Sequence, residues 1–450
     1  MKKAALFMAC ALAVTALAGC SSSSSTAETT AAAGGTATEA AGGSEGGEVN
    51  MIMTWWGNQV RNERTQQALD LYAEQNPGVH IEGQFSEWSD YWNKLATSAA
   101  GQAMPDLLQM DYMYVDQYVK SGLLLDLTPY IEDGTLDTSN ISENTMASGT
   151  VDGGVYAICA GINSPALLYN KTLTDSLGIE IKDNMTMDEF FALSKQIYEQ
   201  SGVKTNIAYG IGESWSAYFV RGLGFSCFTE DGTGMGGSAE EWVPFFEVYT
   251  KGLEEGWLID PGVFAEISVG SVEQEPLVYG STPETQSWCA FYNSNQLGAM
   301  QNAAPEGMEI GITTWPSYDP VKSNYLKSSQ FFSVGATTAY PEEAVKVLDF
   351  LTNSSDANNI LLGERGVPAN SVIAEEITPQ LSEQDQEVTR FINEVVTPNC
   401  SPIDPPQPDG SNEVYDLLNR TVEQVCYGQL DAQTAANTFY EGAVEIMSGK

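Results

Sequence analysis

An alternation of short apolar runs and helical patterns, which begins at Val49, constrains the fold of this chain more than any other feature. Each apolar run is bounded by turn-forming residues, as strands are, and each helical pattern carries apolar side chains three or four positions apart. The expected strands are 49–56, 80–85 and 106–110, and the expected helices are 59–75, 88–103 and 114–120. This alternation predicts an α/β fold with parallel strands covered by helices. Ligands of such sheets bind beyond the carboxyl ends of the strands.

The expected strand ends have an unusual composition, because each places an aromatic ring beside a hydrogen-bonding side chain. The pairs are Trp56 with Asn58, Glu87 with Trp88, and Asp111 with Tyr112. A flat ring can pack against the C–H face of a sugar, and the polar neighbour can bind a hydroxyl group. Any single ring serves equally well as a core residue, so the prediction of a ligand site depends on the coincidence of three pairs.

Adjacent side chains of a strand point to opposite faces, so Trp55 and Trp56 are expected to differ in their surroundings. We predict that Trp55 lies in the core and that Trp56 faces the ligand, because Gly57 lets the chain turn directly after Trp56.

The N-terminal residues predict export. Lys2 and Lys3 precede an apolar run over residues 4–17, which is typical of a secretory signal and too short for a membrane span. The string Leu17-Ala18-Gly19-Cys20 resembles the lipobox of bacterial lipoproteins, which implies a signal peptide over 1–19 and lipidation of Cys20. An ordinary signal peptide with a chance cysteine is the alternative. Residues 20–48 lack large apolar side chains after Cys20 and predict a flexible tether.

The composition excludes several classes of function. Lysine and arginine number 19 against 60 aspartates and glutamates, which gives a net charge of −41. So few cations cannot build a face for nucleic acid or for anionic lipid, and we expect membrane contact only through the lipid anchor. The 450 residues correspond to two or three domains, and 10% aromatic residues argue against a disordered acidic chain.

The sequence contains no catalytic or metal-binding motif that we could identify. His80 is the only histidine and lies in an expected strand, so it is interpreted as structural. That disfavours sites of the Ser-His-Asp or Cys-His type, and neither zinc-protease nor calcium-loop strings occur. We therefore predict no catalytic residue, no metal and no cofactor. A glycosidase that uses Glu87 and Asp111 remains an alternative, as does a binding protein for a charged solute such as an amino acid or polyamine.

Cysteine usage favours free thiols over disulfides. Beyond Cys20, the cysteines of the expected folded part are odd in number, well separated and without a CxxC pair; they are Cys159, Cys227, Cys289, Cys400 and Cys426. One or two disulfides are the alternative.

Several strings, together with the lipobox and the Ser-rich tether, resemble one family. They are WWGN at 55–58, NPGVHIEGQFSEWSDYWNKL at 76–95, PDLLQMDYMYVDQYVKSGLLLDL at 105–127 and VYAICAGINSPALLYNK at 155–171. The chain from Val49 onward resembles the extracellular solute-binding proteins of bacterial carbohydrate ABC transporters, the family of the maltodextrin-binding protein. The resemblance implies a two-lobe periplasmic-binding-protein-like fold, discontinuous lobes joined by a hinge, and a sugar held between the lobes. It also implies a monomer that delivers its ligand to the transmembrane subunits of a permease.

The resemblance also implies where the chain crosses the hinge, namely near 155–170, 310–316 and 363–370. The expected N-terminal lobe is then 49–160 with 312–363, and the expected C-terminal lobe is 161–311 with 364–450.

Further ligand contacts are implied by matching this family. Asn163 falls where relatives often place a ligand-facing polar residue. The other candidates are Trp215 and Arg221 on an expected helix, Trp288 and Asn293 in an expected strand region, and Tyr415 on an amphipathic helix expected over 414–436. The rings serve equally well as core residues.

Overall fold

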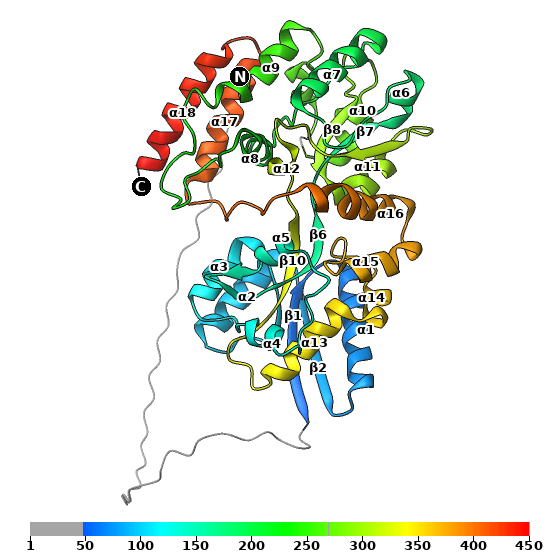
Figure 1. The fold of residues 1–450 in the computed structure, drawn as a ribbon, viewed down its shortest axis with the longest axis vertical. Coiled ribbons are helices and arrows are strands. Elements are labelled where there is room, and N and C mark those ends of the chain that lie inside the picture. The colour runs from blue at the N-terminus through cyan, green and yellow to red at the C-terminus, as the bar shows by residue number, and fades with distance from the viewer. Residues whose placement is uncertain (1–47, 269, 450) are drawn as a thin grey trace, which may run out of the picture. The chain divides into compact units, whose positions relative to one another are not determined.

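The computed structural model describes residues 48–268 and 270–449 (Figure 1). The predicted signal peptide, Cys20 and the tether up to residue 47 lie outside the described residues. The strands are β1 (Val49–Trp56), β2 (Val79–Ser86), β3 (Leu107–Met110), β4 (Thr150–Val151), β5 (Gly154–Val155), β6 (Ile158–Asn163), β7 (Pro165–Asn170), β8 (Cys289–Asn293), β9 (Ile310–Thr313) and β10 (Lys327–Val334). None of the helices in the described part of the chain combines the length and apolarity that a membrane span needs.

Helices make up most of the remaining regular structure. They are α1 (Gln59–Gln75), α2 (Trp88–Ala100), α3 (Tyr112–Lys120), α4 (Thr128–Glu132), α5 (Glu143–Ala147), α6 (Lys171–Ser176), α7 (Met187–Ser201), α8 (Gly212–Leu223), α9 (Val243–Glu254), α10 (Pro276–Tyr279), α11 (Leu297–Ala303), α12 (Pro320–Ser323), α13 (Pro341–Asn353), α14 (Ser355–Leu361), α15 (Ser371–Ile377), α16 (Glu383–Arg390), α17 (Ser411–Cys426) and α18 (Ala432–Ser448).

The first sheet has the strand order β2-β1-β3-β10-β6. β1 pairs in parallel with both β2 and β3, which confirms the predicted parallel core of the sheet. β10 pairs antiparallel with β3 and with β6, so a strand from late in the chain completes this sheet. The parallel pairing brings the carboxyl ends of β1, β2 and β3 to one edge.

The second sheet has the order β8-β7-β9 and is antiparallel throughout. β7 follows β6 after the single residue Ser164, so the chain passes directly from the first sheet to the second (Figure 1). Leu167 packs into one hydrophobic cluster, whereas its neighbours Ala166 and Leu168 pack into the other. The second sheet is therefore covered on both faces by apolar side chains.

The expected helix over 414–436 is wrong, because the structure has two helices there, α17 and α18. Gly428 has a φ of +67°, a left-handed conformation that glycine adopts without strain, and the Asp431 side chain then caps α18 by accepting the Thr434 N–H at 2.7 Å. Apolar side chains continue through the break because both helices pack on α9, which explains why the sequence pattern suggested one helix.

The five cysteines of the described chain are free, and all except Cys400 are buried, in agreement with the prediction of free thiols.

Candidate functional site

The three predicted polar residues of the first sheet lie at the N-termini of α1, α2 and α3, beyond the carboxyl ends of β1, β2 and β3. Asn58 caps α1 by accepting the Arg61 N–H at 2.9 Å, and Asp111 caps α3 by accepting the Met113 N–H at 3.0 Å. Glu87 occupies the same position at α2, but its exposed side chain makes no capping hydrogen bond. Of these three side chains, only that of Glu87 takes no part in a helix cap.

Burial raises the pKa of the Asp111 carboxyl above its usual range, although the Met113 N–H and Lys327 act in the opposite direction. Asp111 therefore lies in a less hydrated environment than an ordinary surface carboxylate.

Aromatic rings gather beside these helix ends. The Trp56 ring lies 4.9 Å from that of Trp88 and 5.6 Å from that of Trp92, and Trp92 lies 4.0 Å from Tyr114. Trp88 and Trp92 are four residues apart on α2, a spacing that puts both rings on one side of the helix. We call Trp56, Trp88, Trp92 and Tyr114 the aromatic cluster.

Trp56, which we predict to face the ligand, is not the exposed ring of the cluster. Trp56 is only 9% exposed, because the rings of α2 cover it, whereas Trp88 is 42% exposed. The exposed indole ring of the cluster thus comes from the start of α2. The prediction for Trp55 is confirmed: it is fully buried, and its indole N–H donates to the Asn62 side-chain oxygen at 2.9 Å.

Trp92 has an unusual polar group within the cluster. Its indole N–H is buried and has no hydrogen-bond acceptor among the described residues. A buried donor without a partner costs free energy. A ligand that placed an acceptor beside the Trp92 indole N–H would therefore form a hydrogen bond that the ligand-free protein lacks.

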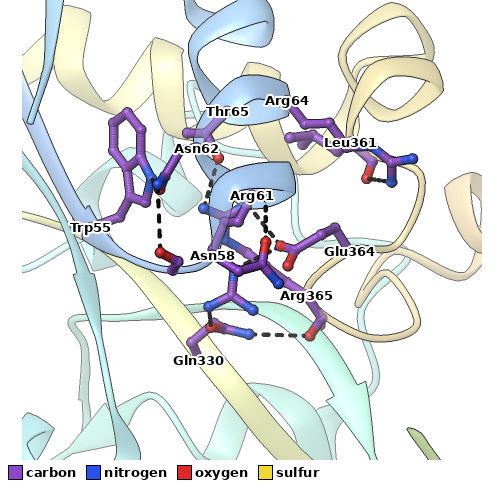
Figure 2. Close-up of polar contacts among 12 residues, drawn as sticks. Trp55, Asn58, Arg61, Asn62, Arg64, Thr65, Gln330, Leu361, Glu364 and Arg365 are labelled. Carbon is purple, nitrogen blue, oxygen red and sulfur yellow. Dashed lines mark hydrogen bonds and ion pairs between the residues drawn. The ribbon is translucent and has the colours of Figure 1, made fainter. Parts of the chain in front are cut away.

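A network of largely buried charged side chains joins α1 to the first sheet and to the loop after α14 (Figure 2). The Arg61 guanidinium on α1 donates to Glu364 at 2.6 Å, to Gln330 on β10 at 2.7 Å, and to the carbonyl of Trp56 at 3.3 Å. Arg365 donates to Gln109 on β3 at 2.9 Å and to Thr65 on α1 at 2.8 Å. The end of β1 is thereby tied to the loop after α14.

That loop also reaches β6, because Val367 pairs with Ile162 in an isolated bridge. Burial, together with the nearby Arg61, lowers the pKa of the Arg365 guanidinium to about 9, so Arg365 keeps its charge at neutral pH.

Three predicted contacts from the second half of the chain lie in the core. Trp215 and Trp288 are fully buried and Tyr415 is 6% exposed. The Trp288 indole N–H donates to Thr205 at 2.8 Å, and Trp215 packs against Phe291 and Trp315. Their predicted contact with a ligand does not fit this structure, since neighbouring rings and α17 occupy the space around them.

The predicted contact Arg221 is also buried, and its donors are used by the chain itself. It forms an ion pair with Asp404 at 2.6 Å and donates to Ser401 at 2.5 Å and to the carbonyl of Pro402 at 2.8 Å. The Tyr112 hydroxyl donates to the carbonyl of Asp404 at 2.8 Å. Both predicted residues therefore hold the 401–404 segment, which leads from α16 toward α17 (Figure 1).

Asn163 ends β6, and its side-chain oxygen is buried without a hydrogen-bond partner in the described residues. Asn293 ends β8 and lines a cavity of about 130 Å³. The cavity is also lined by Asn206, Tyr209, Glu275, Tyr292 and Gln296. Asn163 and Asn293 thus each end a strand, the former in the first sheet and the latter in the second.

Glu275 is the principal group that sequence reasoning missed. It is 7% exposed, and it accepts hydrogen bonds from Asn206 at 2.8 Å and from the Tyr292 hydroxyl at 3.1 Å. Burial raises the pKa of its carboxyl to about 7. The available signal was weak: a single acid directly before Pro276 and an apolar stretch.

Within residues 48–268 and 270–449, no group of three or more His, Cys, Asp or Glu side chains is arranged to hold a metal ion.

Comparisons with known proteins place the chain among binding proteins. Residues 56–358 match the model of the family described as bacterial extracellular solute-binding protein. The chain is 23% identical over 363 residues to the maltodextrin-binding protein MdxE of Bacillus subtilis, covering 75% of this chain and 76% of that protein.

Solved structures share the fold. A family 1 extracellular solute-binding protein from Alicyclobacillus acidocaldarius has a TM-score of 0.80 and 25% identity, covering 90% of this chain and all of that one (100%). A periplasmic oligogalacturonide-binding protein from Yersinia enterocolitica has a TM-score of 0.73 and 19% identity, covering 89% of this chain and 99% of that one. The predicted α/β fold of the periplasmic-binding-protein type is thereby confirmed. The chain belongs to the bacterial extracellular solute-binding protein family.

Proposed function

We propose that the protein captures a sugar or oligosaccharide between its two lobes and delivers it to the permease of an ABC transporter. The observation that carries the proposal is the aromatic cluster at the carboxyl edge of the first sheet, where the exposed Trp88 directly follows Glu87, whose carboxylate makes no capping hydrogen bond. A ring face with a carboxylate at its side suits a pyranose, which has an apolar C–H face and hydroxyl donors. MdxE, whose name gives maltodextrin as its ligand, supports a carbohydrate.

The mechanism is ligand-driven closure without chemical change. A ligand that contacts both lobes binds the closed state more tightly than the open state, and so shifts the population toward closure. We propose 49–160 with 312–363 as the N-terminal lobe and 161–311 with 364–450 as the C-terminal lobe. The direct step from β6 to β7 then lies at the hinge, where Ser164 is fully buried.

The proposal includes a place for the protein outside the cell. After removal of residues 1–19, lipid on Cys20 anchors the protein to the membrane, and residues 20–48 act as the tether. One acyl chain binds a membrane only marginally, so stable anchoring requires two or more chains. The protein acts as a monomer with the permease as its partner, without nucleic acid or cofactor.

Isothermal titration of the purified protein with maltodextrins, chitooligosaccharides and oligogalacturonides tests the proposal. We expect saturable binding of at least one carbohydrate, and Trp88→Ala should weaken it by about 2 kcal/mol, or about thirtyfold. Tyr318→Ala is the matched control, because Tyr318 is 42% exposed, as Trp88 is, lies outside the aromatic cluster and should leave affinity unchanged.

Two results would contradict the proposal. Product formation from a bound oligosaccharide, lost in Glu87→Gln and Asp111→Asn, would show the glycosidase alternative. Binding of spermidine or an amino acid with no carbohydrate bound would show the charged-solute alternative.

A further inference from the structure

Glu275 is a buried carboxylate that faces a cavity. The cavity of about 130 Å³ lies where β8 ends, and its lining includes Tyr292 and Asn293 from β8. Asn293 lies opposite Pro165, the first residue of β7, so the cavity adjoins the point where the chain enters the second sheet. The space is enough for several water molecules or for one substituent of a ligand.

The hydrogen bonds of Glu275 leave part of its capacity unused. One carboxylate oxygen accepts from the Asn206 amide and the other from the Tyr292 hydroxyl. A carboxylate offers about four acceptor positions, so these two neutral donors leave the others open.

Glu275 also lacks a cation. No Lys, Arg or His among the described residues forms an ion pair with it, although other buried acids are paired, such as Glu364 with Arg61 at 2.6 Å. An ionised carboxylate taken out of water without a counter-charge is costly, and neutral donors compensate this cost only in part.

We propose that this cavity is a subsite for a protonated amino group of the ligand, and that Glu275 is its counter-ion. The inference rests on the proposed function and narrows its substrate class to sugars that carry a free amine. An ammonium group supplies up to three hydrogen-bond donors and the missing charge, whereas a hydroxyl group supplies one donor and no charge.

The walls of the cavity suit a cation as well. Tyr209 lines it and stacks flat on Phe264, with ring centroids 4.0 Å apart and an interplanar angle of 8°. Tyr292 adds a second ring, and Asn293 and Gln296 add amide oxygens that can accept from an ammonium group.

Glu275 changes its charge near neutral pH, whereas its titratable neighbours keep theirs. Burial raises the pKa of both Tyr292 and Cys289 on β8, so both stay neutral. Hydrogen bonding lowers the pKa of the exposed Glu273, which stays ionised. An ammonium ligand favours ionised Glu275, so binding should release a proton below pH 7 and strengthen as the pH rises to about 7, as long as the amine of the ligand stays protonated.

The test compares matched ligands by isothermal titration: glucosamine oligomers, their N-acetylated counterparts and glucose oligomers of equal length. We expect the wild-type protein to bind the free amine about 10- to 100-fold more tightly than either neutral form. Glu275→Gln keeps the shape and the acceptor for Asn206, and it should remove that preference and the proton release. Glu273→Gln is the control, since it removes the same charge two residues away outside the cavity lining and should keep both.

The outcomes separate this inference from the proposed function. Neutral oligosaccharides bound as tightly as the amine, with no change in Glu275→Gln, would overturn the inference and leave carbohydrate binding intact. Spermidine bound through Glu275 with no sugar bound would uphold the subsite and overturn the carbohydrate proposal. Urea unfolding of Glu275→Gln at pH 6 verifies that the variant is folded.

Discussion

At the scale of single residues, Glu275 couples the stability of the protein to pH. Its pKa rises from an ordinary 4.5 to about 7 on folding, because burial disfavours the ionised form. The folded state then binds more protons than the unfolded state between pH 4.5 and 7, so this residue's contribution to stability falls as the pH rises through that window. The cost of ionised Glu275 is complete above pH 7 and amounts to about 3 kcal/mol.

We therefore expect Glu275→Gln to stabilise the ligand-free protein more at pH 8 than at pH 5. Urea unfolding at both pH values, with Glu273→Gln as the control, measures the difference. An equal effect of Glu275→Gln at the two pH values would show that Glu275 titrates normally.

Trp55 and Trp88 should separate folding from binding. Trp55 is fully buried and hydrogen-bonded to Asn62, so Trp55→Ala leaves a cavity and an Asn62 side-chain oxygen without its donor. We expect a loss of about 3–5 kcal/mol in the free energy of unfolding, with ligand affinity retained by the folded protein. Urea unfolding and calorimetric titration measure the two effects. A variant that unfolds normally but fails to bind would instead assign Trp55 to the ligand site.

At the scale of elements, the carboxylate of Glu364 stabilises the loop after α14 by pairing with two arginines. Glu364 is 10% exposed in its side chain and lies 2.6 Å from Arg61 and 4.0 Å from Arg365, so one negative charge serves two guanidiniums. Glu364→Gln should destabilise the protein by about 3–5 kcal/mol, because it leaves buried positive charge uncompensated. Urea unfolding measures the loss. Glu342→Gln is the control: Glu342 pairs with Lys346 on the surface of α13, where an ion pair contributes less than about 1 kcal/mol. Equal losses in the two variants would refute this role of Glu364.

Sequence reasoning predicted the local elements of the first sheet well. The bounds of β1 and α1 agree with the expected 49–56 and 59–75, because apolar periodicity, Asn58 and the Asn76-Pro77-Gly78 turn are signals contained in the segment itself. The place of β10 in that sheet depends on pairing across a long separation in the chain, which no local pattern records.

The same limit applies to the candidate site. The sequence predicted that Asn58, Glu87 and Asp111 lie at one edge of the sheet, because the carboxyl ends of parallel strands meet at the same edge. The sequence could not predict which rings would be buried, because burial here depends on tertiary contacts. Trp56 is covered by rings of α2, and Trp215 is covered by its packing partners in the core. Glu275 was missed because its importance comes from burial without a counter-ion.

At the scale of the whole molecule, location and ligand binding should be separable. If Cys20 carries the lipid anchor, Cys20→Ala should release the protein into the medium or leave it unprocessed, while the affinity of the purified protein stays unchanged. Cell fractionation with immunodetection, followed by calorimetric titration, measures both. Retention of Cys20→Ala at the cell surface would contradict the lipoprotein assignment.

The uneven exposure of the tryptophans also gives the protein an intrinsic optical reporter. Of its nine tryptophans, seven are buried and Trp92 is partly buried, which leaves Trp88 as the indole open to solvent. A small neutral quencher such as acrylamide therefore reaches one emitter far more readily than the other eight, whereas iodide would be repelled by the net charge of −41. A sugar stacked on Trp88 would shield that emitter, so the quenchable fraction of the fluorescence would count occupied molecules without any label.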